Sequence, residues 1–311
     1  MNKNSRIFVA GGNTLIGAAI LRQLERQGYG NVLGGQNPAL DLTHSGQADD
    51  FFSRQLPEYV IVAAGKSGGI EANRKYPAEL MLDNLLVGSH IIHSAYRHGV
   101  KKLLYLASSC CYPRDCPQPM QVESLLTGPL EPTNEAYAVA KIAGIKLCQA
   151  YRQQHGTNFI VGIPANAFGE DDDFSLDHSH VVPAMLCKMH EAKVQGADQV
   201  EIWGTGTPRR EFIFADDLAD ACIFLMQNYN SEEPINLGSG TDVSIRDLAH
   251  LAGQVVGYKG QFRFDNTKPD GMPFKALDSS RLREMGWSAA TPLSVALAAT
   301  YESFLQRPAG N

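Results

Sequence analysis

The sequence is poor in the features that mark secreted, membrane-spanning and nucleic-acid-binding proteins. It holds six cysteines in 311 residues, too few for a disulfide scaffold, and no Cys-x-x-Cys spacing of the zinc-binding kind. No apolar run approaches the roughly 20 residues of a membrane-spanning helix, and the start MNKNSRIFVAGG has no signal-peptide core or cleavage site. The net charge of −6 gives no reason to expect nucleic acid as a partner. We therefore expect a cytoplasmic globular protein with no metal, nucleic-acid or membrane partner.

What the sequence does contain is a regular alternation of apolar runs and helical patterns. The predicted strands of the first half are 6–10, 59–65, 102–109 and 158–166. The predicted helices are a pattern that ends at residue 27, then 79–99 and 134–156. Buried strands that alternate with helices are typical of a parallel sheet covered on both faces. The first half therefore predicts an α/β protein.

A glycine-rich turn joins the first predicted strand to the first predicted helix, in AGGNTLIGAAI (10–20). Gly11 permits a tight turn and Gly17 permits close helix packing, while a helix N-terminus offers N–H groups to a pyrophosphate. Thr14 stands where such motifs have their middle glycine, but the order of strand, turn and helix is that of a dinucleotide phosphate site. It favours a Rossmann-type doubly wound parallel sheet that binds a nicotinamide dinucleotide.

The segment expected to contact the adenine ribose is NVLGGQNPALDL (31–42). An acidic residue here would favour NAD, and an arginine would favour the 2′-phosphate of NADP. Gly34, Gly35 and Gln36 are neither, so the choice between NADP(H) and NAD(H) stays open from these residues.

The regular alternation ends near residue 167. The acidic stretch after it is expected to be a loop, and shorter elements follow at 181–193, 199–203, 211–214, 216–228, 245–257, 261–264 and 292–306. We predict an NAD(P)-binding domain at 1–167, to which a segment at about 211–240 returns. Residues 168–311 would form mainly a smaller α/β substrate-binding domain.

Tyr137 and Lys141 are four residues apart within a strong helical pattern, so both lie on one helix face. An ammonium near a phenol is expected to lower the phenol pKa from its usual value of about 10. A tyrosine of this kind can pass a proton to a carbonyl oxygen as hydride reaches the carbon. Ser108, after the preceding strand, is placed to hydrogen-bond the same oxygen.

Two adjacent cysteines follow this serine in LASSCCYPRD (106–115). Adjacent cysteines form a disulfide only with strain, and the spacing does not suggest metal binding. The remaining alternatives are buried core thiols, which are common, and a catalytic thiol.

At this point the residues match a known family. The chain resembles the extended short-chain dehydrogenase/reductases, and among them the branch that epimerises and reduces GDP-4-keto-6-deoxy-mannose at C3, C5 and C4. The segments that carry the resemblance are GKSGGIEAN (65–73), SSCCYP (108–113), EPTNEAYAVAKIAGIKLC (131–148), SHVVPAML (179–186), WGTGTPRREFIFADD (203–217) and KPDGMPFKALD (268–278).

The resemblance implies a role for each matching residue. The reductase set would be Ser108, Tyr137 and Lys141, and the epimerase acid/base pair would be Cys110 and His180. Cys111 would be core packing. The residues implied in cofactor binding are Gly11, Gly12, Asn13, Thr14, Leu15, Ile16, Gly17, Asp41, Leu42, Ala63, Ala64, Gly65, Lys141, Pro164, Asn166, Ala167 and His180. Those implied in binding the GDP-sugar are Ser108, Asn166, Lys188, Trp203, Arg210 and Asp278. The family pattern also implies NADP(H) as cofactor and a homodimer formed through the helices at 79–99 and 134–156.

The chemistry of the proposed epimerase pair also follows from the residue types. Protons on carbons flanking a ketone are acidic, and inverting such a carbon needs a base on one face and an acid on the other. A thiol has an ordinary pKa of about 8.5 and a histidine of about 6.5, so small shifts bring both into working range. Ser108 and Tyr137 would stabilise the enolate oxygen.

Four departures from the family pattern concern binding. Lys188 replaces an arginine, Phe274 replaces a basic residue, Thr14 replaces the middle glycine, and residues 34–36 are neutral. A lysine keeps the charge but loses the bidentate geometry of arginine. Another GDP-4-keto sugar, such as a 6-deoxy-heptose, therefore remains an alternative substrate. A non-catalytic NAD(P) sensor and an epimerase without net redox change remain alternative functions.

Overall fold

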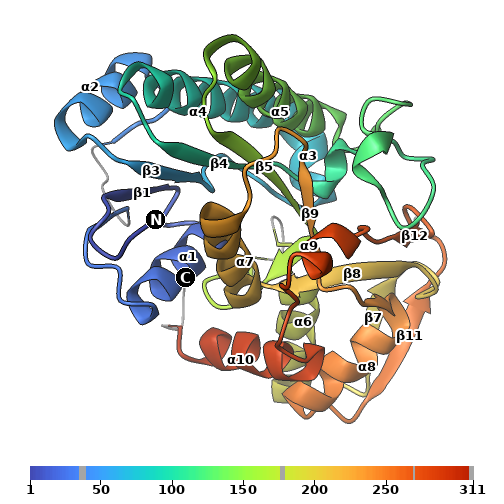
Figure 1. Cartoon of the computed structure of the whole chain (residues 1–311). Helices are drawn as coiled ribbons and strands as arrows, with labels where there is room; N and C mark the ends of the chain where they lie inside the picture. The colour runs from blue at the N-terminus through green and yellow to red at the C-terminus, as the bar shows by residue number, and fades with distance from the viewer. Residues whose placement is uncertain (35–39, 176–178, 269, 308–311) are drawn as a thin grey trace.

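A six-stranded parallel sheet forms the centre of the larger part of the molecule (Figure 1). The structure is a computed structural model that describes residues 1–34, 40–175, 179–268 and 270–307. In spatial order the strands are β2 (Val32–Leu33), β1 (Ile7–Ala10), β3 (Tyr59–Val62), β4 (Lys102–Leu106), β5 (Phe159–Pro164) and β9 (Ile235–Leu237). The strand order reverses between β1 and β3, and ligands of such sheets bind beyond the carboxyl ends of the strands at this point.

Helices cover both faces of this sheet, as the alternating pattern predicted (Figure 1). On one face α1 (Leu15–Arg26) packs against α7 (Ala215–Asn228). On the other, α4 (Pro77–Arg97) packs between α2 (Ser45–Gln55) and α5 (Glu135–His155). The helix at 134–156 was predicted within one residue at each end, because Gly156 adopts the left-handed conformation, with φ of 67°, that ends α5.

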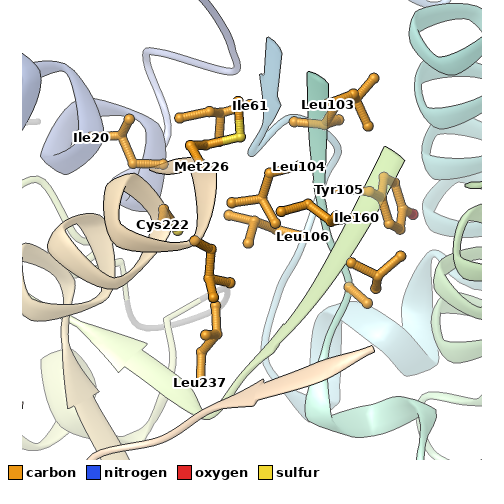
Figure 2. Packing of buried hydrophobic residues seen from close by; sticks show 14 of the residues in the cluster. Ile20, Ile61, Leu103, Leu104, Tyr105, Leu106, Ile160, Cys222, Met226 and Leu237 are labelled. Carbon is orange, nitrogen blue, oxygen red and sulfur yellow. The ribbon is translucent and has the colours of Figure 1, made fainter. Parts of the chain in front are cut away.

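The buried core lies between the sheet and these helices (Figure 2). Ile20 of α1 and Cys222 and Met226 of α7 face the middle strands, and all three side chains are buried. The strands read as continuous apolar runs because both of their faces are covered. This core holds the strand ends rigidly, and the candidate site lies at those ends.

The third predicted strand is shorter than expected. We predicted a strand over 102–109, but β4 ends at Leu106, and Ser109–Cys111 form one turn of 3-10 helix. The Ser108 side chain accepts the backbone N–H of Cys110 at 3.3 Å and so caps this turn. Serine competes with a strand for backbone hydrogen bonds in this way, and apolar content alone does not reveal it.

Beyond β5 the chain leaves the large sheet. The short strand β6 (Asn166–Phe168) pairs with β8 (Arg209–Phe214), which also pairs with β10 (Asp242–Ser244) and β12 (Phe274–Lys275). Residue 168, expected in a loop, therefore lies in a strand, because β8 supplies a pairing edge. The part of the predicted loop at 176–178 lies outside the described residues.

The other elements of the second half complete a smaller layer. Strands β7 (Gln199–Trp203) and β11 (Gln261–Asp265) pair in parallel, and α6 (Val181–Gln195), α8 (Ile245–Val256) and α10 (Leu293–Leu305) pack nearby. Helices that the sequence did not predict are α2, the shorter α3 (Ile70–Lys75) and α9 (Ser280–Glu284), and a 3-10 turn at Val122–Ser124.

The buried apolar side chains form two clusters, one around the large sheet and one around the smaller layer. Helix α7 and strand β9 belong to the first cluster; β8 contributes Ile213 to it but pairs only within the smaller sheet. Leu277, Leu282 and Trp287 also return to the first cluster. We therefore propose a nucleotide-binding part made of 1–167, α7, β9 and the segment 277–287, with the rest of 168–311 forming the substrate-binding part.

Among the described helices, none is both long and apolar enough to cross a membrane. The described residues also contain no group of three or more histidine, cysteine or acidic side chains placed to hold a metal ion. All six cysteines are free thiols.

Candidate active site

The glycine-rich turn brings the N-terminus of α1 against the end of β3. A Cβ atom at Gly11 would lie 2.7 Å from the Ala64 Cα, and Gly11 has a φ of 84° that favours glycine. A Cβ at Gly17 would lie 1.9 Å from the Gly11 carbonyl oxygen. Both glycines are therefore needed for the close packing of α1 on the sheet.

Thr14 takes the position of the middle glycine of the motif and stabilises the turn there with its side chain. It is the N-cap of α1: its Oγ1 accepts the Gly17 N–H at 3.1 Å and donates to the Gly11 carbonyl oxygen at 2.8 Å. The turn therefore keeps its tight form with a threonine at this position. Asn13 is exposed at the start of the helix, where free N–H groups favour an anion.

The other proposed cofactor residues lie around the same edge of the sheet. Ala63–Gly65 directly follow β3, and Pro164–Ala167 span the end of β5 and the start of β6. The expected ribose-contacting residues Gly35 and Gln36 lie outside the described part of the chain. Asp41 and Leu42 are described: hydrogen bonds from Thr43 lower the pKa of Asp41, and the Leu42 carbonyl oxygen lies 3.2 Å from the His90 ring nitrogen Nδ1. The turn, the strand order and the small residues at the strand ends fit a nicotinamide dinucleotide.

Tyr137 and Lys141 extend from α5 toward the end of β4, as their spacing predicted. The Lys141 Nζ donates to the Leu106 carbonyl oxygen at 3.3 Å and lies 5.8 Å from the centre of the Tyr137 ring. The Tyr137 hydroxyl is within hydrogen-bonding reach of Ser108, a contact that acts to lower the pKa of the phenol. Three side chains expected to act together are thus brought together at one strand end.

The predicted effect of Lys141 on Tyr137 is wrong for this structure. Burial raises the pKa of Tyr137 above its ordinary value, and this effect exceeds the opposing one of the Ser108 hydrogen bond. Burial likewise lowers the pKa of Lys141, from 10.5 to about 8. Desolvation is the larger effect on both groups, so Tyr137 stays a protonated phenol at neutral pH, as a proton donor must.

The buried charge of Lys141 leads to a stability prediction. Lys141 is only 6% exposed, and a pKa lowered from 10.5 to about 8 corresponds to about 3 kcal/mol of unfavourable burial when charged. We expect Lys141→Met to stabilise the fold at pH 7 by about 1–3 kcal/mol, because loss of the hydrogen bond to Leu106 offsets part of the gain. Urea unfolding measures the difference.

The pH dependence of that difference distinguishes charge from packing. Below pH 8 the buried ammonium destabilises the folded chain by the full amount. This destabilisation disappears as the pH rises from about 8 to 10.5, where the unfolded lysine also loses its proton. The gain in stability should therefore shrink by pH 10.5. An equal gain at both pH values, or a loss at pH 7, contradicts the interpretation. Lys259→Met, which removes an exposed lysine, is the matched control.

The two adjacent cysteines have different surroundings. Cys111 is fully buried, its Sγ faces the Ala138 carbonyl oxygen at 3.8 Å, and burial raises its pKa to about 12. The half-buried Cys110 instead receives hydrogen bonds from the Asn134 amide, at 3.1 Å, and the Lys275 ammonium, at 3.8 Å. Cys111 is a core thiol, whereas Cys110 faces polar donors.

His180 is the N-cap residue of α6, at the edge of the smaller layer. The residue is exposed at the surface, but protein atoms near the ring partly desolvate it and lower its pKa; Asp173 opposes this effect, and Lys275 adds a smaller lowering. The same Lys275 contacts Cys110. Lys275 therefore links the two proposed acid/base residues, which come from opposite halves of the chain.

The residues proposed to bind the GDP-sugar include an exposed cationic cluster. The Trp203 ring is 53% exposed, and the ammonium groups of Lys188 and Lys268 lie 5.4 Å and 5.1 Å from its centre. Nearby, Arg210 Nη2 donates to the Asp270 carbonyl oxygen at 3.3 Å. An exposed aromatic ring between cations suits a nucleotide, whose base stacks and whose phosphates are anionic.

Two further proposed binding residues use their polar atoms within the protein. The Asn166 amide donates to the Glu211 carbonyl oxygen at 3.1 Å. The Asp278 carboxylate accepts the Ser280 N–H at 2.9 Å, and this contact lowers its pKa. Asp278 therefore stabilises the turn before α9, whatever further contact it makes.

Sequence reasoning missed Lys268, Lys275 and Asn134. All three lie inside segments that carry the family resemblance, KPDGMPFKALD and EPTNEAYAVAKIAGIKLC. Nothing in those segments alone indicates that Asn134 and Lys275 meet at one sulfur atom, since they are 141 residues apart in the chain.

The fold and the Ser–Tyr–Lys arrangement define an extended short-chain dehydrogenase/reductase, an oxidoreductase/epimerase that uses a nicotinamide dinucleotide. The chain belongs to the NAD dependent epimerase/dehydratase family, whose sequence model matches residues 7–238.

Named relatives and solved structures are similar to this chain over nearly its whole length. The chain is 52% identical over 305 residues to GDP-L-fucose synthase 1 of Arabidopsis thaliana, covering 98% of this chain and 94% of that one. Among solved structures, a GDP-L-fucose synthetase from Naegleria fowleri bound to NADP superposes with a TM-score of 0.91 at 29% identity, covering 98% and 94%. A GDP-6-OMe-4-keto-L-xylo-heptose reductase from C. jejuni superposes with a TM-score of 0.93 at 31% identity, covering 98% and 99%.

Proposed function

We propose that this protein converts GDP-4-keto-6-deoxy-D-mannose to GDP-L-fucose by epimerisation at C3 and C5 and NADPH-dependent reduction at C4. The observation that carries the proposal is the meeting of a reductase set and a polar-contacted thiol at the end of β4. Ser108, Tyr137 and Lys141 converge there, and Cys110 follows Ser108 by two residues. Identity of 52% to a relative named for this synthesis supports the choice of substrate.

Epimerisation needs a proton to leave one face of the sugar ring and another to arrive on the opposite face. The Cys110 thiolate takes the proton from C3, and the electron pair of the C–H bond moves to the C4 oxygen as an enolate. Ser108 and Tyr137 donate hydrogen bonds to that oxygen. His180 returns a proton to C3 from the other side, and the cycle repeats at C5 after the pair exchanges protons with solvent.

Reduction uses the same oxygen-binding groups. When bound, NADPH supplies the hydride that C4 receives. Tyr137, which burial keeps protonated, gives its proton to the C4 oxygen, and Lys141 and Ser108 hold its ring and hydroxyl in position. The new bonds are C4–H and O–H, and the phenol regains its proton from solvent. One site thus performs both reactions.

We propose NADPH rather than NADH as the natural cofactor. Residues 34–36 hold no acidic side chain that would repel a 2′-phosphate. The Naegleria fowleri structure holds NADP. Lys188 and Lys268 beside Trp203, together with Arg210, would receive the GDP part of the substrate.

Another GDP-4-keto sugar is the second candidate substrate, because the C. jejuni heptose reductase shares this fold with a TM-score of 0.93. Its identity of 31% is lower than the 52% of the Arabidopsis thaliana relative. The alternative differs from the main proposal in the sugar, not in the chemistry at C4.

We also propose that the protein is a homodimer and acts in the cytoplasm. Helices α4 and α5 pack side by side and expose Leu82, Tyr96 and Val139, which would form part of the interface. Six free thiols suit a reducing compartment.

The test is turnover of a panel of GDP-4-keto sugars with NADPH or NADH in D2O. We expect one NADPH consumed per product, GDP-L-fucose as the product by NMR, and deuterium at C3 and C5. Reduction of only a heptose substrate supports the second candidate. Cofactor binding without oxidation, with every sugar of the panel, overturns the proposal in favour of a sensor, and inversion without net oxidation favours a redox-neutral epimerase.

A further inference from the structure

The sulfur of Cys110 is approached by two hydrogen-bond donors from distant parts of the chain. The Asn134 amide nitrogen, at the start of α5, lies 3.1 Å from Sγ, and the Lys275 ammonium, at the end of β12, lies 3.8 Å away. Both groups only donate at these atoms. The Cys110 sulfur is therefore the acceptor in both contacts, and one of the two donors carries a positive charge.

The Asn134 side chain contacts Cys110 instead of capping helix α5. It is the N-cap residue of α5, where asparagine normally accepts a backbone N–H of the first turn, but its side chain makes no such bond. Its Oδ1 atom is buried without a hydrogen-bond partner. Both the missing cap bond and the unpaired buried oxygen are unfavourable for the fold. The hydrogen bond that the side chain makes in place of the cap is the one to the Cys110 sulfur.

Lys275 is placed by a rigid backbone. Strand β12 pairs with β8, and Lys275 lies opposite Arg210. The next residues are tied down in turn: the Ala276 N–H donates to Gln118 Oε1 at 3.1 Å, and the Leu277 N–H donates to the buried Glu211 at 2.7 Å. Within the described chain, Lys275 forms no ion pair with a carboxylate. Its charge is therefore available to the sulfur.

The other titratable groups around Cys110 do not neutralise this charge. Tyr137 of α5 and the neighbouring Cys111 interact with Cys110, and both are uncharged at neutral pH because burial raises their pKa values. His180 also experiences the Lys275 charge, which disfavours its protonated form. The positive charge of Lys275 therefore faces the Cys110 sulfur without a neighbouring anion among these groups.

We propose that Lys275 and Asn134 are positioning residues that stabilise the Cys110 thiolate and aim it at the sugar ring; this rests on the proposed epimerisation. A thiolate held before substrate arrives is ready to act as the base. Lys275 also belongs to the substrate-binding half, so residues from both halves of the chain contact the sulfur.

The direct test needs no substrate. The rate of iodoacetamide alkylation at Cys110, followed by peptide mass spectrometry, reports how much thiolate is present, and peptide analysis separates Cys110 from the half-buried Cys116. We expect Lys275→Met to lower this rate at pH 7 by about tenfold or more, and Asn134→Ala to lower it several-fold. Lys275→Arg should retain most of the rate, and the exposed Lys259→Met should leave it unchanged.

Raising the pH tests the cause. At pH 10 most thiols are ionised, so the rates of wild type and Lys275→Met should converge if the lysine acts by its charge. Equal rates at pH 7 overturn the proposal, as does a deficit that persists at pH 10, which would indicate blocked access. If the Met variant does not fold, as judged by thermal unfolding, Lys275→Gln carries the same test.

A second readout separates this inference from the proposed function. With GDP-4-keto-6-deoxy-D-mannose in D2O, Lys275→Met should slow deuterium entry at C3 and C5 by about tenfold or more, mainly in kcat. Changed alkylation without any turnover by wild type contradicts the proposed function alone. Wild-type turnover with unchanged alkylation in Lys275→Met contradicts the inference alone.

Discussion

Replacing Tyr137 with phenylalanine is expected to lower the rate of 4-reduction by about a thousandfold or more. The change removes one hydroxyl, the proton donor to the C4 oxygen, and leaves the ring beside Lys141 in place. General acid catalysis typically contributes about 10²–10⁴ in rate, and the hydrogen bond to the enolate oxygen is lost with it. NADPH oxidation with the GDP-4-keto substrate measures the effect.

The matched control for this variant is Tyr258→Phe. It also removes one tyrosine hydroxyl, but that group donates to the Ala197 carbonyl oxygen in the smaller part of the molecule. Its reduction rate should stay near that of wild type. Hydride transfer near the wild-type rate in Tyr137→Phe contradicts the assignment of Tyr137 as the proton donor.

Replacing Cys110 with serine is expected to slow epimerisation far more than reduction. A hydroxyl in place of the thiol forms an anion much less readily, so the base is lost while Ser108, Tyr137 and Lys141 remain. We expect deuterium entry at C3 and C5 to fall by at least about a hundredfold. Reduction of the unepimerised 4-keto sugar should continue, and NMR of the product distinguishes the two outcomes.

The neighbouring thiol supplies the control. Cys111→Ala removes a fully buried sulfur whose contact is a backbone carbonyl of α5, so it should lower stability by about 1 kcal/mol or more and leave exchange intact. Exchange that is unchanged in Cys110→Ser contradicts its role as the base. If only Cys111→Ala lost the exchange, the base would be Cys111 and not Cys110.

Much of the larger sheet could be predicted from the sequence because its signals are local. Strands such as β1 and β3 are short apolar runs, and helices α4 and α5 show apolar positions at helical spacing with glycines at their ends. Elements whose formation depends on a partner were missed. β6 and β12 are two or three residues long and exist because β8 pairs with them.

The candidate site divides in the same way. Tyr137 and Lys141 could be paired from their spacing on one helix, and Ser108 from its position after a strand. The raised pKa of Tyr137 could not be predicted, since the prediction considered the lysine charge and the structure adds burial, which has the larger effect. Thr14 caps helix α1, which is a local feature, but the prediction from sequence treated this residue only as a missing glycine.

By itself, the sequence determined the α/β class, the nucleotide turn and the identity of the reactive residue types, because each depends on neighbours within a few positions. Only the tertiary structure decided which cysteine works and what surrounds it. Cys110 and Cys111 are adjacent in sequence, yet a single 3-10 turn directs one into the core and the other toward Asn134 and Lys275. Contacts between residues 110 and 275 depend on how the two parts pack, and no local pattern encodes that distance.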